Sequence, residues 1–155
     1  MSLNNLIGRS LEFVEPDRAT IARLLAAAER NIADSHAENV SSETRFDAAY
    51  KAIMQLANAA LQANGYRTLT SKPGHHATMI QVLNLTIGLD RNTIIVLDAL
   101  RKQRNDSDYL GDIIPVSTMA DCISHAENLN RDVLNWIKEN KPEFLEKQIR
   151  KKADN

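Results

Sequence analysis

The sequence contains little cysteine, glycine, proline and aromatic side chain, and each shortage excludes a class of protein. The single cysteine, Cys122, rules out a disulfide framework within the chain and favours a reducing compartment. Five glycines and four prolines lie between periodic segments rather than inside them, as is typical of a helical protein. Aromatic residues make up only 5% of the chain, and no segment alternates clearly between polar and apolar residues, so strands are not expected.

The chain also lacks long apolar runs and an excess of charge of one sign. Its apolar runs are short, as at Ile94-Ile95-Val96-Leu97, whereas a membrane helix needs about 20 such residues. The N-terminal residues do not have the basic-then-apolar order of a signal peptide, so we expect a cytoplasmic protein without membrane contact. Nineteen Lys and Arg residues offset 20 Asp and Glu residues, so nucleic-acid binding would need a local basic patch.

The length and apolar content suit one helical domain. With 155 residues, 43% of them hydrophobic, the chain can bury a sizeable core. We expect a single domain over 1–155, with a core in about 17–140 and a charged C-terminal tail over 141–155.

Apolar residues recur at three- and four-residue spacing in six segments, which predicts helices. The predicted helices are 3–13, 17–36, 41–64, 75–89, 91–109 and 117–141. Asp17, Ser42 and Asp90 are the expected N-caps, Asn64-Gly65 is an expected helix end, and 66–74 is the expected longest loop. Four long amphipathic helices with short connections pack as antiparallel neighbours. We therefore expect an all-α, up-and-down bundle of four to five helices with a short N-terminal helix.

The predicted helix over 91–109 changes from apolar to charged along one face. At about 100° per residue, Arg104 falls within the face set by Val96, Leu97 and Leu100. A buried, unpaired guanidinium is very costly, so Arg104 must meet a carboxylate, water or another chain. Two interpretations stay open: the last turns leave the core and are solvated, or they form a polar site or dimer contact. Such a site would combine cations with hydrogen-bond acceptors: Arg101, Lys102, Arg104, Asn105, Asp106 and Asp108.

The segment Arg-Lys-Gln-Arg-Asn-Asp-Ser-Asp-Tyr at 101–109 resembles the signature helix end of the HEPN superfamily. In that family an Arg, usually followed by a polar residue such as Asn, precedes a His by a few residues. An Ala-rich helix with Tyr50, a turn at Gly65, a His at 75 or 76 and a long final helix agree with the family order. The resemblance covers roughly 17–139.

This resemblance implies a helical bundle, commonly a homodimer with the motif near a cleft between protomers. Many HEPN proteins are metal-independent RNA endonucleases of toxin–antitoxin or defence systems. Others bind RNA, nucleotides or a partner nucleotidyltransferase without catalysis. In the nucleases the Arg stabilises phosphate charge, for which its fixed fork is suited, and the His acts on the 2′-hydroxyl or the leaving group.

The sequence departs from the family motif at the histidine. Arg104 and Asn105 match, but Tyr109 stands where a His would be expected, and no His occurs between 77 and 124. Tyrosine has a reference pKa of about 10 and is a poor general base at neutral pH. We therefore expect a non-catalytic homodimer that binds RNA, a nucleotide or a partner protein.

Five residues are the expected ligand contacts: Arg101, Arg104, Asn105, Asp108 and His76. One alternative is a ribonuclease that uses Arg104 with Tyr109 or His76, and another is a dimerisation scaffold without a ligand. No cofactor is expected. No metal site is expected either, because the Glu-x-x-His spacing of metal-binding bundles does not occur. Cys122 is expected to be a buried, inert thiol.

Overall fold

The structure is a computed structural model that describes residues 2–71 and 73–145. It is mostly helical, with a small antiparallel sheet of two strands. The elements in chain order are η1 (Leu3–Leu6), β1 (Leu11–Phe13), α1 (Arg18–Ser35), α2 (Ser42–Ala63), β2 (Tyr66–Thr68), α3 (His75–Gln81), α4 (Leu83–Thr86), α5 (Arg91–Leu110), α6 (Val116–Asn140) and η2 (Pro142–Phe144). No helix in these described ranges is long and apolar enough to cross a membrane.

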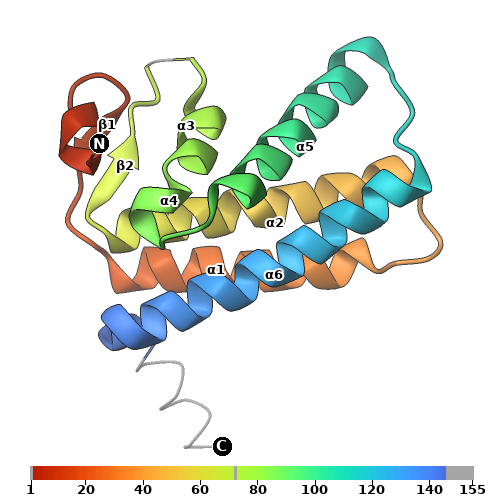
Figure 1. The fold of residues 1–155 in the computed structure, drawn as a ribbon. Coiled ribbons are helices and arrows are strands. Elements are labelled where there is room, and N and C mark those ends of the chain that lie inside the picture. The colour runs from red at the N-terminus through yellow and green to blue at the C-terminus, as the bar shows by residue number, and fades with distance from the viewer. Residues whose placement is uncertain (1, 72, 146–155) are drawn as a thin grey trace, which may run out of the picture.

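The long helices pack around α2. Helix α2 contacts α1 and α6 along its length, and α3, α4 and α5 contact it from another side. Figure 1 shows α1 and α6 side by side along α2, while α5 runs at an angle to α2 and projects beyond it. The expectation of packed amphipathic helices is therefore confirmed, although α5 does not run alongside its neighbours for its whole length.

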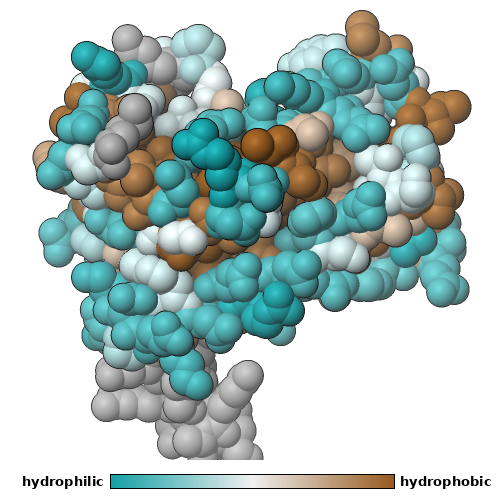
Figure 2. Space-filling model, viewed as in Figure 1, coloured by the Kyte–Doolittle hydropathy of each residue, from teal (hydrophilic) through white to brown (hydrophobic). Residues whose placement is uncertain are grey.

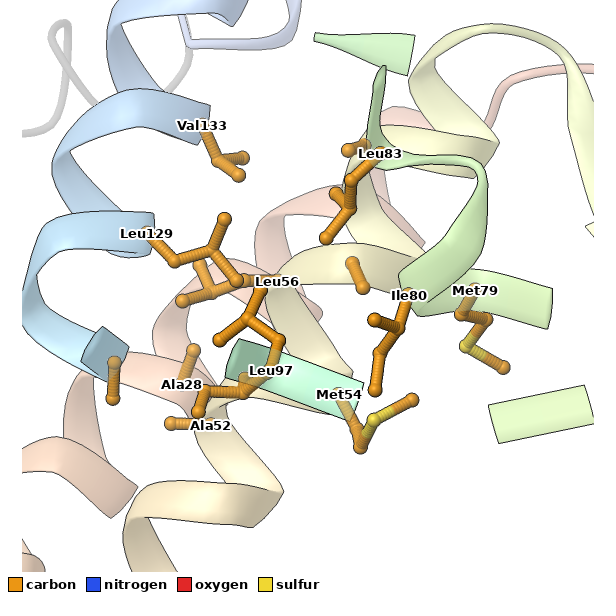
Figure 3. Packing of buried hydrophobic residues seen from close by; sticks show 14 of the residues in the cluster. Ala28, Ala52, Met54, Leu56, Met79, Ile80, Leu83, Leu97, Leu129 and Val133 are labelled. Atoms are coloured by element: carbon orange, nitrogen blue, oxygen red, sulfur yellow. The ribbon is translucent and has the colours of Figure 1, made fainter. Parts of the chain in front are cut away.

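The core is centred on a helix rich in small residues. Six alanines of α2 are buried: Ala49, Ala52, Ala57, Ala59, Ala60 and Ala63. Small side chains let neighbouring helices approach closely, because the distance between helix axes depends on the side chains at the contact. Figure 3 shows larger side chains from several helices converging beside them, including Leu56 of α2, Leu97 of α5 and Leu129 of α6.

Polar side chains cap the starts of three long helices, α1, α2 and α5. Asp17 accepts a hydrogen bond from the backbone N–H of Thr20 at 3.3 Å and Asp90 from that of Thr93 at 3.0 Å, which confirms two predicted N-caps. The third prediction is wrong by one residue. Ser41, with extended backbone at ψ 159°, caps α2, whereas Ser42 already lies in the first turn, and a cap needs a non-helical backbone.

The predicted helix over 3–13 is also wrong. Residues Leu3–Leu6 form one short 3-10 turn, and Leu11–Phe13 form a strand that pairs with Tyr66–Thr68. The expected loop over 66–74 therefore begins with a strand. Apolar residues at 3, 6, 7 and 11 fit helical spacing, but the pairing partner lies far along the sequence and leaves no local signal.

The predicted helix over 75–89 is divided into α3 and α4 by a turn at Val82. Ile80, Val82 and Leu83 are all buried. In a straight helix Val82 would point away from the face shared by Ile80 and Leu83, at about 100° per residue, so the turn allows all three to enter the core. Helix α6 begins at Val116, one residue before the predicted start, directly after Pro115.

Two residues outside the predicted core region belong to the core: Leu11 of β1 and Phe144 of η2 are both buried. The remaining part of the predicted charged tail, from residue 146 onward, lies outside the described residues.

Candidate functional site

Helix α5 contributes to the core only in its first half. Ile94, Leu97 and Leu100 are its buried residues, whereas Val96 is 39% exposed. The buried face is therefore rotated slightly from the predicted one, and it continues at the same spacing into Arg101 and Arg104. Beyond Leu100 the helix leaves the core, and its end stands clear of α2 in Figure 1.

Arg104 is held between an aromatic ring and a carboxylate. Its Cζ lies 5.3 Å from the centre of the Tyr50 ring, within the range of a cation–π contact. Its Nε lies 3.0 Å from Oδ2 of Asp108, one turn further along α5, and the side chain is 35% exposed. This Nε is buried and makes no hydrogen bond among the described residues, so the contact with Asp108 is an ion pair with poor hydrogen-bond geometry.

Tyr50 also joins Arg104 to His76. Tyr50 is 3% exposed, and its hydroxyl oxygen lies 3.2 Å from Nδ1 of His76 at the start of α3. Burial raises the pKa of Tyr50 to about 12, against the opposing charges of Arg104 and Arg101, so the phenol stays protonated at neutral pH. In the His76 tautomer with its proton on Nε2, Tyr50 donates this hydrogen bond.

His76 is held in its neutral form. Burial lowers its pKa, and the neighbouring His75 and the charges of Arg104 and Arg101 lower it further. Since unperturbed histidine already titrates below neutral pH, His76 carries no charge there. The adjacent His75 contacts it edge-on, with ring centres 4.9 Å apart, and the buried Nδ1 atom of His75 has no hydrogen-bond partner among the described residues.

Carboxylates offset the other cations of α5. Asp98 lies 2.8 Å from Nε of Arg101 and 3.4 Å from Nζ of Lys102. Burial tends to raise the pKa of Asp98, but the hydrogen bond and charge of Arg101 outweigh it, so the pKa lies below its usual value. This face is therefore close to charge balance rather than strongly basic.

One further carboxylate faces the same cluster from α2. Burial raises the pKa of Asp47, and so does the nearby charge of Asp108, whereas Arg104 opposes them. A phosphate that approaches Arg104 would therefore meet the negative charge of Asp108 and Asp47.

A groove of about 270 Å³ adjoins this cluster. Tyr50 and His76 line it together with apolar side chains from three helices: Leu24 of α1, Met54 of α2 and Met79 of α3. The Tyr50 side chain thus belongs both to the groove and to the contact with Arg104.

The predicted site residues are only partly brought together. Arg101, Arg104 and His76 lie around Tyr50, and Asp108 contacts Arg104. Tyr109 is 84% exposed and contacts none of them through a hydrogen bond or ring contact in the described part of the chain. Asn105 is half-buried, and its side chain makes no hydrogen bond among the described residues.

Sequence analysis missed Tyr50 as a member of the site. An aromatic residue on the apolar stripe of a helix usually belongs to the core. Tyr50 is indeed buried there. Only its hydroxyl contact with His76 and its ring contact with Arg104 distinguish it, and both depend on how α3 and α5 pack against α2.

The described residues contain neither a metal-binding cluster nor a reactive thiol. No group of three or more His, Cys, Asp or Glu side chains with metal-binding geometry occurs in residues 2–71 and 73–145. Cys122 is fully buried, and burial raises its pKa to about 12. Because the thiolate is the reactive form, this thiol is inert at neutral pH.

A second surface feature lies where α5 meets α6. Four large apolar or aromatic side chains are more than half exposed there: Tyr109, Leu110, Ile113 and Val116. We call them the apolar tip. Figure 2 shows brown, apolar residues at this end of the molecule, next to polar surface. Contiguous exposed apolar residues often mark a contact with another protein.

Comparison of the sequence with protein-family models finds no match. Comparison with curated protein sequences finds no match either.

Proposed function

We propose that this chain is a HEPN-like module that binds a phosphate-bearing ligand, RNA or a nucleotide, at Arg104 and does not cleave it efficiently. The observation that carries the proposal is the position of Arg104. Its guanidinium is partly exposed, lies over a buried aromatic ring and adjoins a groove. The match of Arg104 and Asn105 to the HEPN motif supports the same assignment.

The site has a simple way to bind phosphate. Guanidinium groups form paired, charge-assisted hydrogen bonds with phosphate oxygens. The ring of Tyr50 limits the orientations of Arg104, so less side-chain freedom is lost when the ligand binds. A phosphate takes the place of Asp108 beside Arg104, and the resulting affinity falls with salt.

The absence of a motif histidine supports binding without efficient cleavage. Tyr109 is exposed and lies apart from the Tyr50 and His76 contact. General acid–base catalysis needs a proton-transfer group within hydrogen-bond reach of the reacting atoms, and the exposed Tyr109 does not lie in that position beside the cluster.

One observation favours a ribonuclease as the second candidate. His76 is neutral and lies close enough to Arg104 for the guanidinium charge to lower its pKa. In the tautomer with its proton on Nδ1, His76 donates to Tyr50, and its Nε2 can accept a proton from a 2′-hydroxyl. If this chain cleaves RNA, His76 rather than Tyr109 is the residue that we expect to act with Arg104.

Labelled single-stranded RNA distinguishes the two candidates. Wild type, Arg104→Ala and His76→Gln are incubated with the RNA in the presence of a chelator, and gels record cleavage and mobility shift. Arg131→Ala on α6, an exposed arginine, is the control. A shift without cleavage, lost only in Arg104→Ala, supports the binding module. Chelator-resistant cleavage lost in Arg104→Ala and His76→Gln supports the ribonuclease and overturns the first proposal.

We further propose that two copies associate through the apolar tip, as homodimeric HEPN proteins do near their motif. The tip adjoins the charged end of α5, so such a dimer would place both Arg104 sites near its interface. A cytoplasmic toxin–antitoxin or defence system, with RNA or a nucleotidyltransferase partner, is the setting that the resemblance suggests. A scaffold without ligand is the remaining alternative, and it would dimerise but bind no RNA.

A further inference from the structure

We infer that the groove between α1, α2 and α3 binds a single nucleobase, while the phosphate of the same nucleotide reaches Arg104. The inference rests on the phosphate binding proposed above, and it adds the part of the ligand that gives selectivity. Three features of the groove carry it: its apolar walls, its hydrogen-bond donors and its connection to Arg104 through Tyr50.

The walls suit a flat ring. Leu24, Met54 and Met79 face the groove from three helices, and Met54 and Met79 are 7% and 8% exposed. Figure 3 shows both methionines at the side of the core away from Leu129 and Val133. Methionine adapts its shape and makes favourable contacts with aromatic rings. The groove volume of about 270 Å³ lies just below the range of drug-sized pockets, which begins at about 300 Å³, so the space suits one ring system.

The polar side chains of the groove offer more unused donors than acceptors. Gln55 already accepts a hydrogen bond from Asn31 at 2.8 Å, and Asn58 accepts one from Gln62 at 3.2 Å. Each amide carbonyl thus already accepts one hydrogen bond, whereas the NH2 groups of Gln55 and Asn58 make none among the described residues and can donate to a ligand. Lys51 is also a donor, and no carboxylate is among the described residues that line the groove.

A ring that carries acceptors on its edge therefore complements the donors of this groove. Nucleobases do so through carbonyl oxygens and ring nitrogens, and single-stranded RNA exposes these edges. A purely apolar ring would leave the donors of Gln55 and Asn58 without partners, which costs free energy when water is excluded.

Tyr50 joins the groove to the phosphate site. It lines the groove, and Arg104 lies over its ring at 5.3 Å. The Tyr50 side chain therefore lies between the two subsites, in the place that the sugar takes between base and phosphate in a nucleotide. His76 lies at the same junction. Tyr50 contacts its Nδ1, so Nε2 is the nitrogen that remains for the sugar.

The test uses three probes: uridine 5′-monophosphate, uridine and ribose 5-phosphate. Their affinities are measured by calorimetric titration for wild type, Asn58→Leu, Gln55→Leu and Arg104→Ala. Asn128→Leu, an exposed site on α6, is the control, and circular dichroism checks that each variant is folded. We expect Asn58→Leu and Gln55→Leu each to weaken uridine and the monophosphate about tenfold, the loss that about 1.4 kcal/mol corresponds to, and to leave ribose 5-phosphate unchanged.

The outcomes separate this inference from the function proposed above. If both probes with a base bind wild type no better than ribose 5-phosphate does, the nucleobase groove is refuted while phosphate binding stands. If uridine binds as well as its monophosphate and Arg104→Ala changes neither, the phosphate site is refuted and with it the two-part ligand. If Asn58→Leu and Arg104→Ala each weaken binding of the monophosphate, the nucleobase groove and the phosphate site are both supported.

Discussion

Arg104 has two neighbours with opposite effects on a ligand. The Tyr50 ring orients the guanidinium without neutralising it, whereas Asp108 offers a competing negative charge at 3.0 Å. An ion pair that is more than one-third exposed contributes little to stability, typically below about 1 kcal/mol. Asp108 can therefore be exchanged for a phosphate at small cost.

Replacing Asp108 with asparagine should strengthen phosphate binding. Because the competing charge is removed, we expect roughly a two- to fivefold gain in affinity for ribose 5-phosphate, in line with an exposed ion pair. Calorimetric titration at low salt measures it. Asp106→Asn on the same helix, where no ion pair with Arg104 forms, is the matched control. Equal gains in both variants would mean that net charge alone is responsible.

His76 should make the folded protein sensitive to mild acid. Burial lowers its pKa in the folded state, so the unfolded chain takes up the proton at higher pH than the folded chain does. The stability tied to neutral His76 is therefore fully present above the unfolded-state pKa, about 6.5, and is lost as pH falls below it.

Urea unfolding of wild type and His76→Gln at pH 7.5 and at pH 5.5 tests this expectation. The free energy of unfolding of wild type should fall more between the two pH values than that of the variant. Glutamine removes the titrating group but keeps a polar side chain near Tyr50. An identical fall in both proteins would assign the acid sensitivity to other groups.

At the scale of elements, the start of α2 depends on one hydroxyl. Ser41 accepts a hydrogen bond from the backbone N–H of Thr44 at 3.1 Å, while Ser42 lies inside the first turn. Ser41→Ala should lower the free energy of unfolding by about 1 kcal/mol, the usual cost of losing an N-cap. Ser42→Ala is the matched control and should be neutral or slightly stabilising, because alanine favours helices. Urea unfolding measures both, and a larger loss for Ser42→Ala would place the cap at the neighbouring residue.

Helix α5 is built from two halves with different partners. Its first half packs against α2, α3 and α4 through Ile94, Leu97 and Leu100. Its second half carries the charged cluster and ends in the exposed Tyr109 and Leu110. As the first interpretation drawn from the sequence expected, the last turns leave the core, but Arg101 and Arg104 stay partly buried. The same departure places Arg104 beside Tyr50.

At the scale of the whole molecule, the apolar tip should control the oligomeric state. Stable protein interfaces bury about 1,200–2,000 Å², and an apolar centre with a polar rim is typical of them. Leu110→Glu together with Ile113→Glu should convert the proposed dimer to a monomer in sedimentation velocity experiments. Phe13→Glu is the control, because Phe13 is 65% exposed but lies on β1 at the opposite end of the molecule (Figure 1). A wild-type chain that is monomeric at high concentration would contradict the proposal.

Local patterns were enough to predict most of the helices. Asp17, Asp90 and the Asn64-Gly65 pair mark helix ends through hydrogen bonds and backbone preferences that involve only near neighbours. The strand pair could not be predicted in the same way. Leu11 pairs with Thr68, and this distant contact, together with burial of Leu11, decides that the N-terminal segment is extended.

The sequence alone determined a helical protein with one charged helix end, and it singled out Arg104, because periodicity and capping act over a few residues. Only the tertiary structure decided which residues surround Arg104. Tyr50 and His76 come from α2 and α3, and Tyr50 contacts both His76 and Arg104 because three helices pack together. The same packing left Tyr109 in solvent, since α5 leaves the core before reaching it. A side chain's neighbours across the core depend on the whole fold, which no local pattern contains.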